Sequence, residues 1–294
     1  MKRKSVKKPV GERLFETVNV VFLSALAITM LLPLLNIAAT SFSSAQAAES
    51  KWVYFWPVNF TLESWRHILS RQDLWRSTGV SVFVTVTGVV LSLFFTAMTA
   101  YPLSRKYFYP RKAIMVGIVI TMIFRAPLIP YFITVKALGL YNNIWVLIIP
   151  SLISAFDLII MRTFFMQIPD ELEEAAKIEG CNDFQILYKI ILPLSKPIIA
   201  TLGLFAVVLF WNIFQHAIWF IRNNSLYPLQ LKLRAFIVSE EVLVTQGGKI
   251  LDRNFNSTTL LSAAIIFASL PVLSLFPVLQ KYFVKGTLLG SIKQ

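Results

Sequence analysis

The sequence has few charged residues for its length. Asp, Glu, Lys and Arg together make up 15% of the 294 residues, whereas hydrophobic residues make up 56%. A soluble domain carries charged residues at roughly a quarter of its positions. The chain is too apolar and too long for a single soluble core, so its composition indicates an integral membrane protein.

Residues for covalent and metal chemistry are also scarce. Cys181 is the only cysteine, which excludes an internal disulfide, and the two histidines, His67 and His216, lie far apart. A catalytic metal needs several such ligands, so we expect no metal site and no catalytic residues. The chain also has no G-x-x-x-x-G-K-[ST] sequence, so any ATP and Mg that its function uses must be bound by another chain.

Acidic residues are outnumbered by basic ones, and the net charge is +13. A basic balance can indicate nucleic-acid binding. Here the basic residues flank apolar runs and do not line one helix face. This arrangement is typical of the positive-inside bias of membrane proteins, so we expect contact with membrane lipid and no nucleic-acid partner.

Six apolar runs are long enough to cross a bilayer, which takes about 20 residues in a helix. They predict an all-α polytopic membrane protein with a transmembrane domain at 15–284 and six spans at 18–39, 78–103, 113–137, 144–165, 198–221 and 258–283. The first run could instead be a secretory signal, with a cleavage site among the small residues at 45–48. Its length favours an uncleaved transmembrane helix.

Lys and Arg set the predicted orientation. About 17 of the 28 basic residues fall in one alternating set of loops, which includes the short connection 104–112. These loops are therefore predicted to be cytoplasmic, together with both termini, 1–14 and 285–294. The stretches 41–77 and 222–257 are then external. Within the first of them, 60–69 reads as an amphipathic helix capped by Thr61.

The stretch 170–193, DELEEAAKIEGCNDFQILYKIILP, is polar and helix-forming in an otherwise apolar chain. Acidic residues at its start suit the positive end of a helix, and Gly180 is a typical helix stop. Asn182 or Asp183 can cap a second helix, which Pro193 ends before the next span. We therefore predict a helix, a glycine break and a second helix on the cytoplasmic surface, with small Ala175 and Ala176 allowing close approach by a partner.

The same stretch fits the pattern E-A-A-x3-G-x9-I-x-L-P at every fixed position. The matching residues are Glu174, Ala175, Ala176, Gly180, Ile190, Leu192 and Pro193. This pattern resembles the EAA loop of permease subunits of binding-protein-dependent ABC importers. The segments 138–150, 210–212, 227–234 and 280–293 are similar to the carbohydrate branch of that family, within it the maltose-permease-like subunits of oligosaccharide importers in bacteria.

The resemblance implies a type I ABC importer permease fold in the bacterial inner membrane. It implies pairing with a second homologous permease, two ATPase subunits that bind ATP and Mg, and an extracellular or periplasmic solute-binding protein that delivers an oligosaccharide. The seven matching residues of 170–193 would couple the permease to an ATPase. The external loop 222–257 would enter the binding protein, and the tail 285–294 would reach the ATPases.

Polar residues within the predicted spans are candidates for the sugar path, because an ionisable group that faces lipid costs about 2.5–3.5 kcal/mol or more. The candidates are Arg125, Asp157, Trp211, Asn212 and Gln215. The charged residues could equally form packing contacts between helices, and the aromatic ones could face lipid. The sequence does not name the sugar, although Arg125 in a basic chain favours an acidic, uronate-type oligosaccharide.

Two other functions remain open on the residues alone. A secondary transporter or channel for a polar solute would need no ATPase, but it predicts an ion-coupling site and often inverted repeats. An intramembrane enzyme would need a catalytic cluster that the sequence does not supply. Neither alternative explains the pattern at 170–193.

Overall fold

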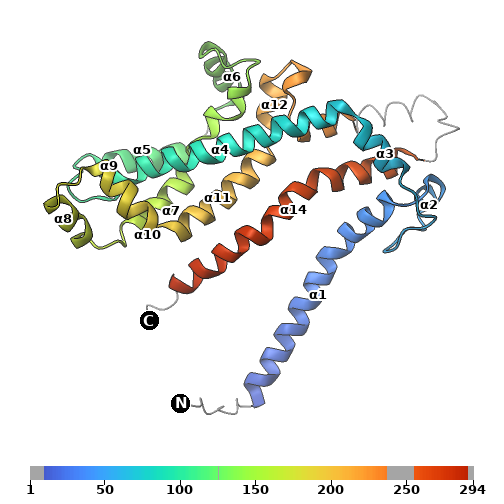
Figure 1. Cartoon of the computed structure of the whole chain (residues 1–294), viewed down its shortest axis with the longest axis horizontal. Helices are drawn as coiled ribbons and strands as arrows, with labels where there is room; N and C mark the ends of the chain where they lie inside the picture. The colour runs from blue at the N-terminus through green and yellow to red at the C-terminus, as the bar shows by residue number, and fades with distance from the viewer. Residues whose placement is uncertain (1–9, 125, 237–254, 291–294) are drawn as a thin grey trace. The chain divides into compact units, whose positions relative to one another are not determined.

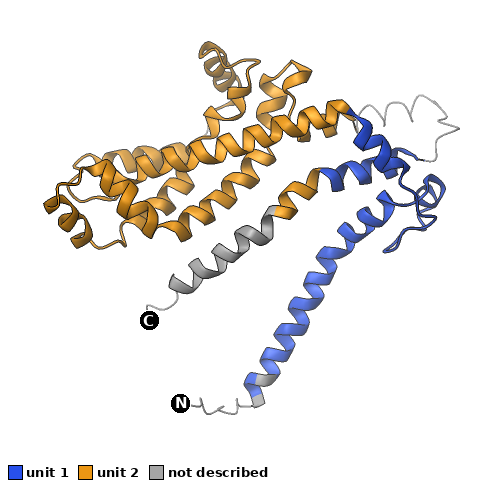
Figure 2. Ribbon diagram, viewed as in Figure 1, with its two compact units in different colours: residues 1–71, 237–267 blue, residues 72–236, 268–294 orange. Residues whose placement is uncertain are grey.

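The computed structural model describes residues 10–124, 126–236 and 255–290. The chain divides into two compact units, Met1–Arg71 with Ile237–Phe267 and Gln72–Phe236 with Ala268–Gln294 (Figure 2). Within the described ranges the regular structure is helical and no strand occurs.

The first unit is built around α1 (Val10–Ser41), a long apolar helix whose membrane-spanning window contains no buried residue. The chain continues into α2 (Ala45–Glu49) and α3 (Glu63–Ser70). The first unit also includes the start of α14 (Ser257–Gly290). The side chain of Asn256 caps α14 by accepting from Thr259 N at 2.9 Å and donates to Ala45 O at 3.1 Å. This amide therefore joins segments from opposite ends of the chain.

The amphipathic helix predicted at 60–69 exists but begins later, at Glu63. Thr61 Oγ1 accepts from Glu63 N at 3.3 Å, yet the N-cap position belongs to Leu62, whose side chain cannot cap. The prediction of a Thr61 cap was therefore wrong by one position.

The second unit carries the helix bundle. Figure 1 shows α4 running along the unit, with α8 and α9 at one end. Its helices are α4 (Gln72–Ser104), α5 (Arg111–Ile123), α6 (Leu128–Ala137), α7 (Ala155–Phe165), α8 (Glu171–Ile178), α9 (Asp183–Ile186), α10 (Leu192–Leu194), α11 (Lys196–Trp211) and α12 (Gln215–Phe220). Short 3-10 turns lie at η1 (Ile144–Leu147), η2 (Ile149–Ser151) and η4 (Asn224–Leu226).

Helix α4 packs against both α7 and α11. The buried residues of α4 are largely small, among them Gly88, Ser92, Thr96, Ala97 and Ala100. Small residues let helix backbones approach closely. In a bilayer the hydrophobic effect does not drive helices together, so they associate through the van der Waals contacts that this close approach allows. At Gly88 the approach is very close, because an added Cβ would lie 2.7 Å from the Phe210 ring of α11.

By length and composition, three described helices can cross a membrane, and the number rises to six if each of three bent helix pairs is one span. The predicted run 113–137 corresponds to α5 and α6 with a break between them, where Pro127 is the N-cap of α6. The predicted run 198–221 is interrupted after Trp211, where α11 ends and α12 begins at Gln215. The boundaries of the spans in the bilayer remain predictions.

Candidate functional site

The stretch 170–193 forms two helical segments joined at a glycine, as the sequence predicted. Helix α8 ends at Ile178, and Gly180 adopts a left-handed conformation with φ +84°. Cys181 N donates to Ala176 O at 2.9 Å, and Gly180 N donates to Lys177 O at 3.0 Å. These two bonds define a Schellman motif, which requires a positive φ at its glycine position. An added Cβ at Gly180 would meet nothing within 4 Å, so the requirement is conformational and not steric.

The second segment starts with a reciprocal cap. Asn182 Oδ1 accepts from Gln185 N, and Gln185 Oε1 accepts from Asn182 N, both at 2.9 Å. The two bonds form a capping box that satisfies two backbone donors at the start of α9. Of the two candidate caps in the sequence, Asn182 takes the position, and Asp183 is the first helical residue.

Pro193 does not end this segment in the simple way that its position suggested. The chain passes from α9 through a π-helical turn, η3 (Leu187–Ile191), into α10, so Pro193 lies inside the helical path. Proline has no N–H and its ring clashes with the carbonyl four residues earlier, here that of Lys189. The wide turn, in which Leu192 N donates to Leu187 O, accommodates this loss.

The inner face of 170–193 packs against the bundle. Ala176, Ile186, Leu187 and Ile191 are buried in one apolar cluster with residues of α4 and α7, and the motif residues Ile190 and Leu192 pack at its edge. Ala176 is only 5% exposed. The expectation that it lies open to a partner's backbone was therefore wrong, because it fills space against its own chain. Ala175, Gly180 and Pro193 are exposed.

A buried arginine holds α8 in place. Arg105 follows directly after α4, and its guanidinium forms an ion pair with Glu173 of α8 and lies 3.6 Å from Asp170 Oδ1. Arg105 is 2% exposed and Glu173 is 4% exposed. Burial raises the pKa of the Glu173 carboxyl, and the positive charge of Arg105 opposes that shift. Loss of Arg105 would leave the Glu173 charge buried without its arginine partner, which is strongly unfavourable.

The same arginine ties two further helix ends together. Arg105 Nη1 donates to Phe165 O, the last residue of α7, at 3.3 Å. In return, Arg162 Nε of α7 donates to Leu103 O, near the end of α4, at 2.8 Å. Cations at helix C-termini satisfy free carbonyls and complement the negative end of the helix dipole. The ends of α4, α7 and α8 therefore form one bonded group, which we call the arginine clamp (Arg105, Arg162 and Glu173).

The outer face of α8 carries an apolar side chain, Ile178, four residues from Glu174 and therefore beside it, whereas Leu172 lies on another side of the helix. Leu172 is 42% exposed and Ile178 is 88% exposed. Glu174 is exposed and has no ion-pair partner among the residues that the structure describes. Lys177 lies 3.8 Å from Asp183, so its charge is partly used within the loop. An exposed apolar side chain beside a free carboxylate suits a protein partner that offers an apolar groove and a cation.

The residues suggested for the sugar path are not gathered into one site. Trp211 is buried and its Nε1 donates to Ala268 O at 3.2 Å, which is a packing contact. Asn212 and Gln215 are exposed on either side of the break between α11 and α12. Asp157 lies in the first turn of α7, is partly buried and makes no ion pair within the described residues. Arg162, five residues later, donates to Leu103 O. Arg125 lies outside the described residues.

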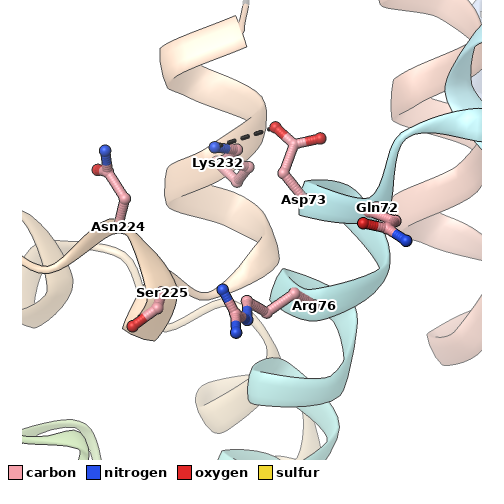
Figure 3. Close-up of a pocket in the computed structure, with 6 residues that line it drawn as sticks. All are labelled: Gln72, Asp73, Arg76, Asn224, Ser225 and Lys232. Atoms are coloured by element: carbon pink, nitrogen blue, oxygen red, sulfur yellow. Dashed lines mark ion pairs between the residues drawn. The ribbon is translucent and has the colours of Figure 1, made fainter.

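A polar cavity of about 530 Å³ opens at the other end of α4 (Figure 3). It is lined by Gln72, Asp73, Arg76, Asn224, Ser225 and Lys232. Lys232 Nζ pairs with Asp73 Oδ2 at 3.1 Å, whereas Arg76 extends from α4 without an ion-pair partner in the described part of the chain (Figure 3). No local sequence pattern marks this cavity or the arginine clamp, because both join residues more than 50 positions apart.

The chain matches the family described as "Binding-protein-dependent transport system inner membrane component" over residues 79–288. It is 41% identical over 287 residues to the polygalacturonan/rhamnogalacturonan transport system permease protein YtcP of Bacillus subtilis (strain 168), covering 96% of this chain and 99% of that one. It is 39% identical over 281 residues to protein LplC of the same organism, covering 96% and 95% of the two chains.

The fold also matches a solved structure. A chain from the crystal structure of a bacterial ABC transporter involved in the import of the acidic polysaccharide alginate superposes with a TM-score of 0.87 at 34% identity. The match covers 95% of this chain and 100% of that chain. The predicted all-helical permease fold and the family resemblance are thereby confirmed: the chain belongs to the inner membrane components of binding-protein-dependent transport systems.

Proposed function

We propose that this chain is one of two permease subunits in an ATP-driven bacterial importer of oligosaccharides. It forms half of the translocation path, and it couples to a separate ATPase through 170–193. The observation that carries the proposal is the shape of this stretch: α8 presents an apolar and acidic outer face, while a buried ion pair fixes its inner face to the ends of two other helices.

The arginine clamp gives the coupling a physical route. A push on α8 reaches Arg105 through Glu173 and passes to the C-terminal ends of α4 and α7 through Arg105 and Arg162. Packed side chains and charged hydrogen bonds transmit such displacement better than an exposed loop, since interiors are close-packed. Glu174 would pair with a cation of the ATPase, and Ile178, four residues further along the same face, would enter its groove.

The partners follow from the family and from what the chain lacks. A second, homologous permease would complete the path, and two ATPase subunits would bind ATP and Mg, because this sequence has no phosphate-binding loop. A solute-binding protein would deliver the sugar on the external side. In this orientation both termini and 170–193 are cytoplasmic, in accord with the positive-inside rule.

We further infer that the substrate is an acidic oligosaccharide. Two similar proteins support this inference: the name of YtcP refers to polygalacturonan and rhamnogalacturonan, and the matching crystal structure is of a transporter involved in the import of the acidic polysaccharide alginate. Within the chain, Arg76 offers a free guanidinium in the polar cavity at the external end of α4. Guanidinium groups bind carboxylates with paired hydrogen bonds, so Arg76 is suited to a uronate.

The test is sugar-stimulated ATP hydrolysis by the complete transporter in liposomes, with Gly180→Ala and Glu174→Gln in this chain. An alanine at Gly180 must hold a left-handed conformation at a cost of about 1–2 kcal/mol, which corresponds to roughly a 5- to 30-fold loss of the competent loop. We expect a loss of stimulation on that scale for Gly180→Ala and a smaller loss for Glu174→Gln.

Two matched controls accompany these variants. Gly117→Ala lies in α5, where an added Cβ meets nothing within 4 Å and no positive φ is required. Glu179→Gln removes the same charge from the C-cap position that directly follows α8. Normal stimulation in all four variants would overturn the coupling assignment. Stimulation by methyl-esterified oligogalacturonate equal to that by the free acid would overturn the substrate assignment alone.

A further inference from the structure

A second cavity lies at the same end of the bundle as α8. It has a volume of about 500 Å³, and it lies between the end of α4, the start of α5, the end of α7 and the segment before α8. Its charged lining residues are Arg105, Lys106, Arg111, Lys112, Arg162, Asp170 and Glu171. Five basic residues face two acidic ones, so the cavity, which we call the basic cavity, is strongly positive.

The clamp and its neighbours use only part of this positive charge. Arg105 is paired with Glu173, and Lys106 Nζ lies 3.6 Å from Asp170 Oδ2. In the described part of the chain, the side chains of Arg111 and Lys112 have no hydrogen-bond or ion-pair partner, although Arg111 is partly buried. These two residues open α5, a helix of 13 residues, so the positive end of its dipole adds to their charge. The cavity thus has unused capacity for an anion.

The surroundings of the basic cavity identify the kind of anion. No residue of α5 is buried, and its apolar side chains lie open directly beyond Arg111 and Lys112, for example Ile114 at 40% and Val116 at 59% exposed. Tyr109, at 97% exposed, precedes them. Exposed apolar residues bordered by tyrosine and basic residues mark the level of the lipid headgroups. A free inorganic anion has no apolar part that could contact the apolar surface beside the cavity.

We propose that the basic cavity binds the phosphate of an anionic phospholipid, whose acyl chains lie along the exposed face of α5. Arg111 and Lys112 bind the phosphate, with Arg162 at the inner wall. The negative charge of the phosphate offsets the repulsion among the cations that line the cavity. Because Arg105 and Asp170 belong to the same lining, the bound phosphate also stabilises the attachment of α8. The proposal depends on the proposed function in one respect only, namely that the cavity lies on the cytoplasmic side of the bilayer.

The test measures the lipid that the transporter complex retains after extraction from nanodiscs of phosphatidylcholine with about 20 mol% phosphatidylglycerol, whose anionic headgroups give the surface a negative potential. Native mass spectrometry counts the phosphatidylglycerol bound to this chain. We expect the double variant Arg111→Gln, Lys112→Gln to weaken retention of phosphatidylglycerol by roughly 30-fold, because each basic residue near a membrane surface contributes about a fivefold gain in binding. Added inorganic phosphate should leave retention by the unmodified chain unchanged.

The control is Lys196→Gln with Arg222→Gln, which removes the same charge from exposed positions outside the basic cavity. Equal retention in the test and control variants would overturn the proposal. Displacement of the lipid by inorganic phosphate would overturn it in favour of a free-anion site. Lipid counting does not depend on ATP hydrolysis, so failure of the proposed function and failure of this proposal give different results.

Discussion

Arg105 is the residue on which three helix ends converge. Its guanidinium contacts Glu173 and Asp170 of the α8 region and Phe165 O of α7, and it directly follows α4. A buried arginine in a membrane protein must find partners for several donors, because desolvation of the charge is otherwise too costly. The contacts of Arg105 offset the cost of a charge at 2% exposure, although its Nε has no hydrogen-bond partner among the described residues.

Replacement of Arg105 by alanine should destabilise the attachment of α8 by about 3–5 kcal/mol, because it leaves Glu173 buried without its partner. Limited proteolysis within 170–193 and the melting temperature of the purified transporter would measure this loss. The Arg105→Ala, Glu173→Gln double variant should recover part of the stability, since it removes the unpaired charge. No recovery in the double variant would contradict the ion-pair account.

Glu173 should also impose a pH dependence with a definite sign. Burial raises its pKa above the ordinary value of 4.5, so the folded protein holds this proton more tightly than the unfolded chain. The corresponding contribution to stability is complete below pH 4.5 and is lost as the pH rises through the raised pKa. The melting temperature of the unmodified chain relative to Glu173→Gln should therefore fall as the pH rises from 4.5 towards neutrality. A difference that rises over this range would refute the assigned direction.

At the scale of elements, the contact between α4 and α11 depends on one glycine. The Phe210 ring occupies the space that a side chain at position 88 would need. Gly88→Ala should destabilise the bundle by about 1–3 kcal/mol through overpacking. Gly79→Ala on the same helix is the matched control, because its Cβ meets nothing within 4 Å. Alanine is favoured over glycine in helices by about 1 kcal/mol, so this control should melt no lower than the unmodified chain.

Recovery of stability in Gly88→Ala by a second change, Phe210→Leu, would show that the ring is the obstacle. Thermal unfolding of these variants in one detergent gives the comparison. If Gly88→Ala melts like Gly79→Ala, the close approach of α4 and α11 does not exist in the membrane.

At the scale of the whole molecule, local sequence patterns predict where helices begin and end, but they do not predict which helices contact one another. The glycine stop at Gly180 and the cap at Asn182 depend on bonds within a few residues, so the sequence predicts them directly. The arginine clamp joins residues that are about 60 positions apart in the chain, and no local pattern marks such a pair. The mostly hydrophobic residues on both sides of Trp211 predict one continuous span, so the break between α11 and α12 is visible only in the structure.

The polar residues in the predicted spans show the same limit. An apolar run reveals that Trp211 and Asp157 lie in helices, but burial and partners decide what they do. Trp211 contributes to packing, whereas Asn212 and Gln215 are exposed and remain candidates for the sugar path.

The most direct test of the coupling claim uses Cys181, the only cysteine of the chain, which lies partly exposed next to Gly180. A membrane-impermeant maleimide is added to inverted and to right-side-out membrane vesicles, with and without the ATPase subunits, and labelling of this chain is followed over time. We predict labelling only in inverted vesicles, and much slower labelling when the ATPase is assembled. Labelling from the external side, or a rate that does not respond to the ATPase, would contradict the coupling assignment.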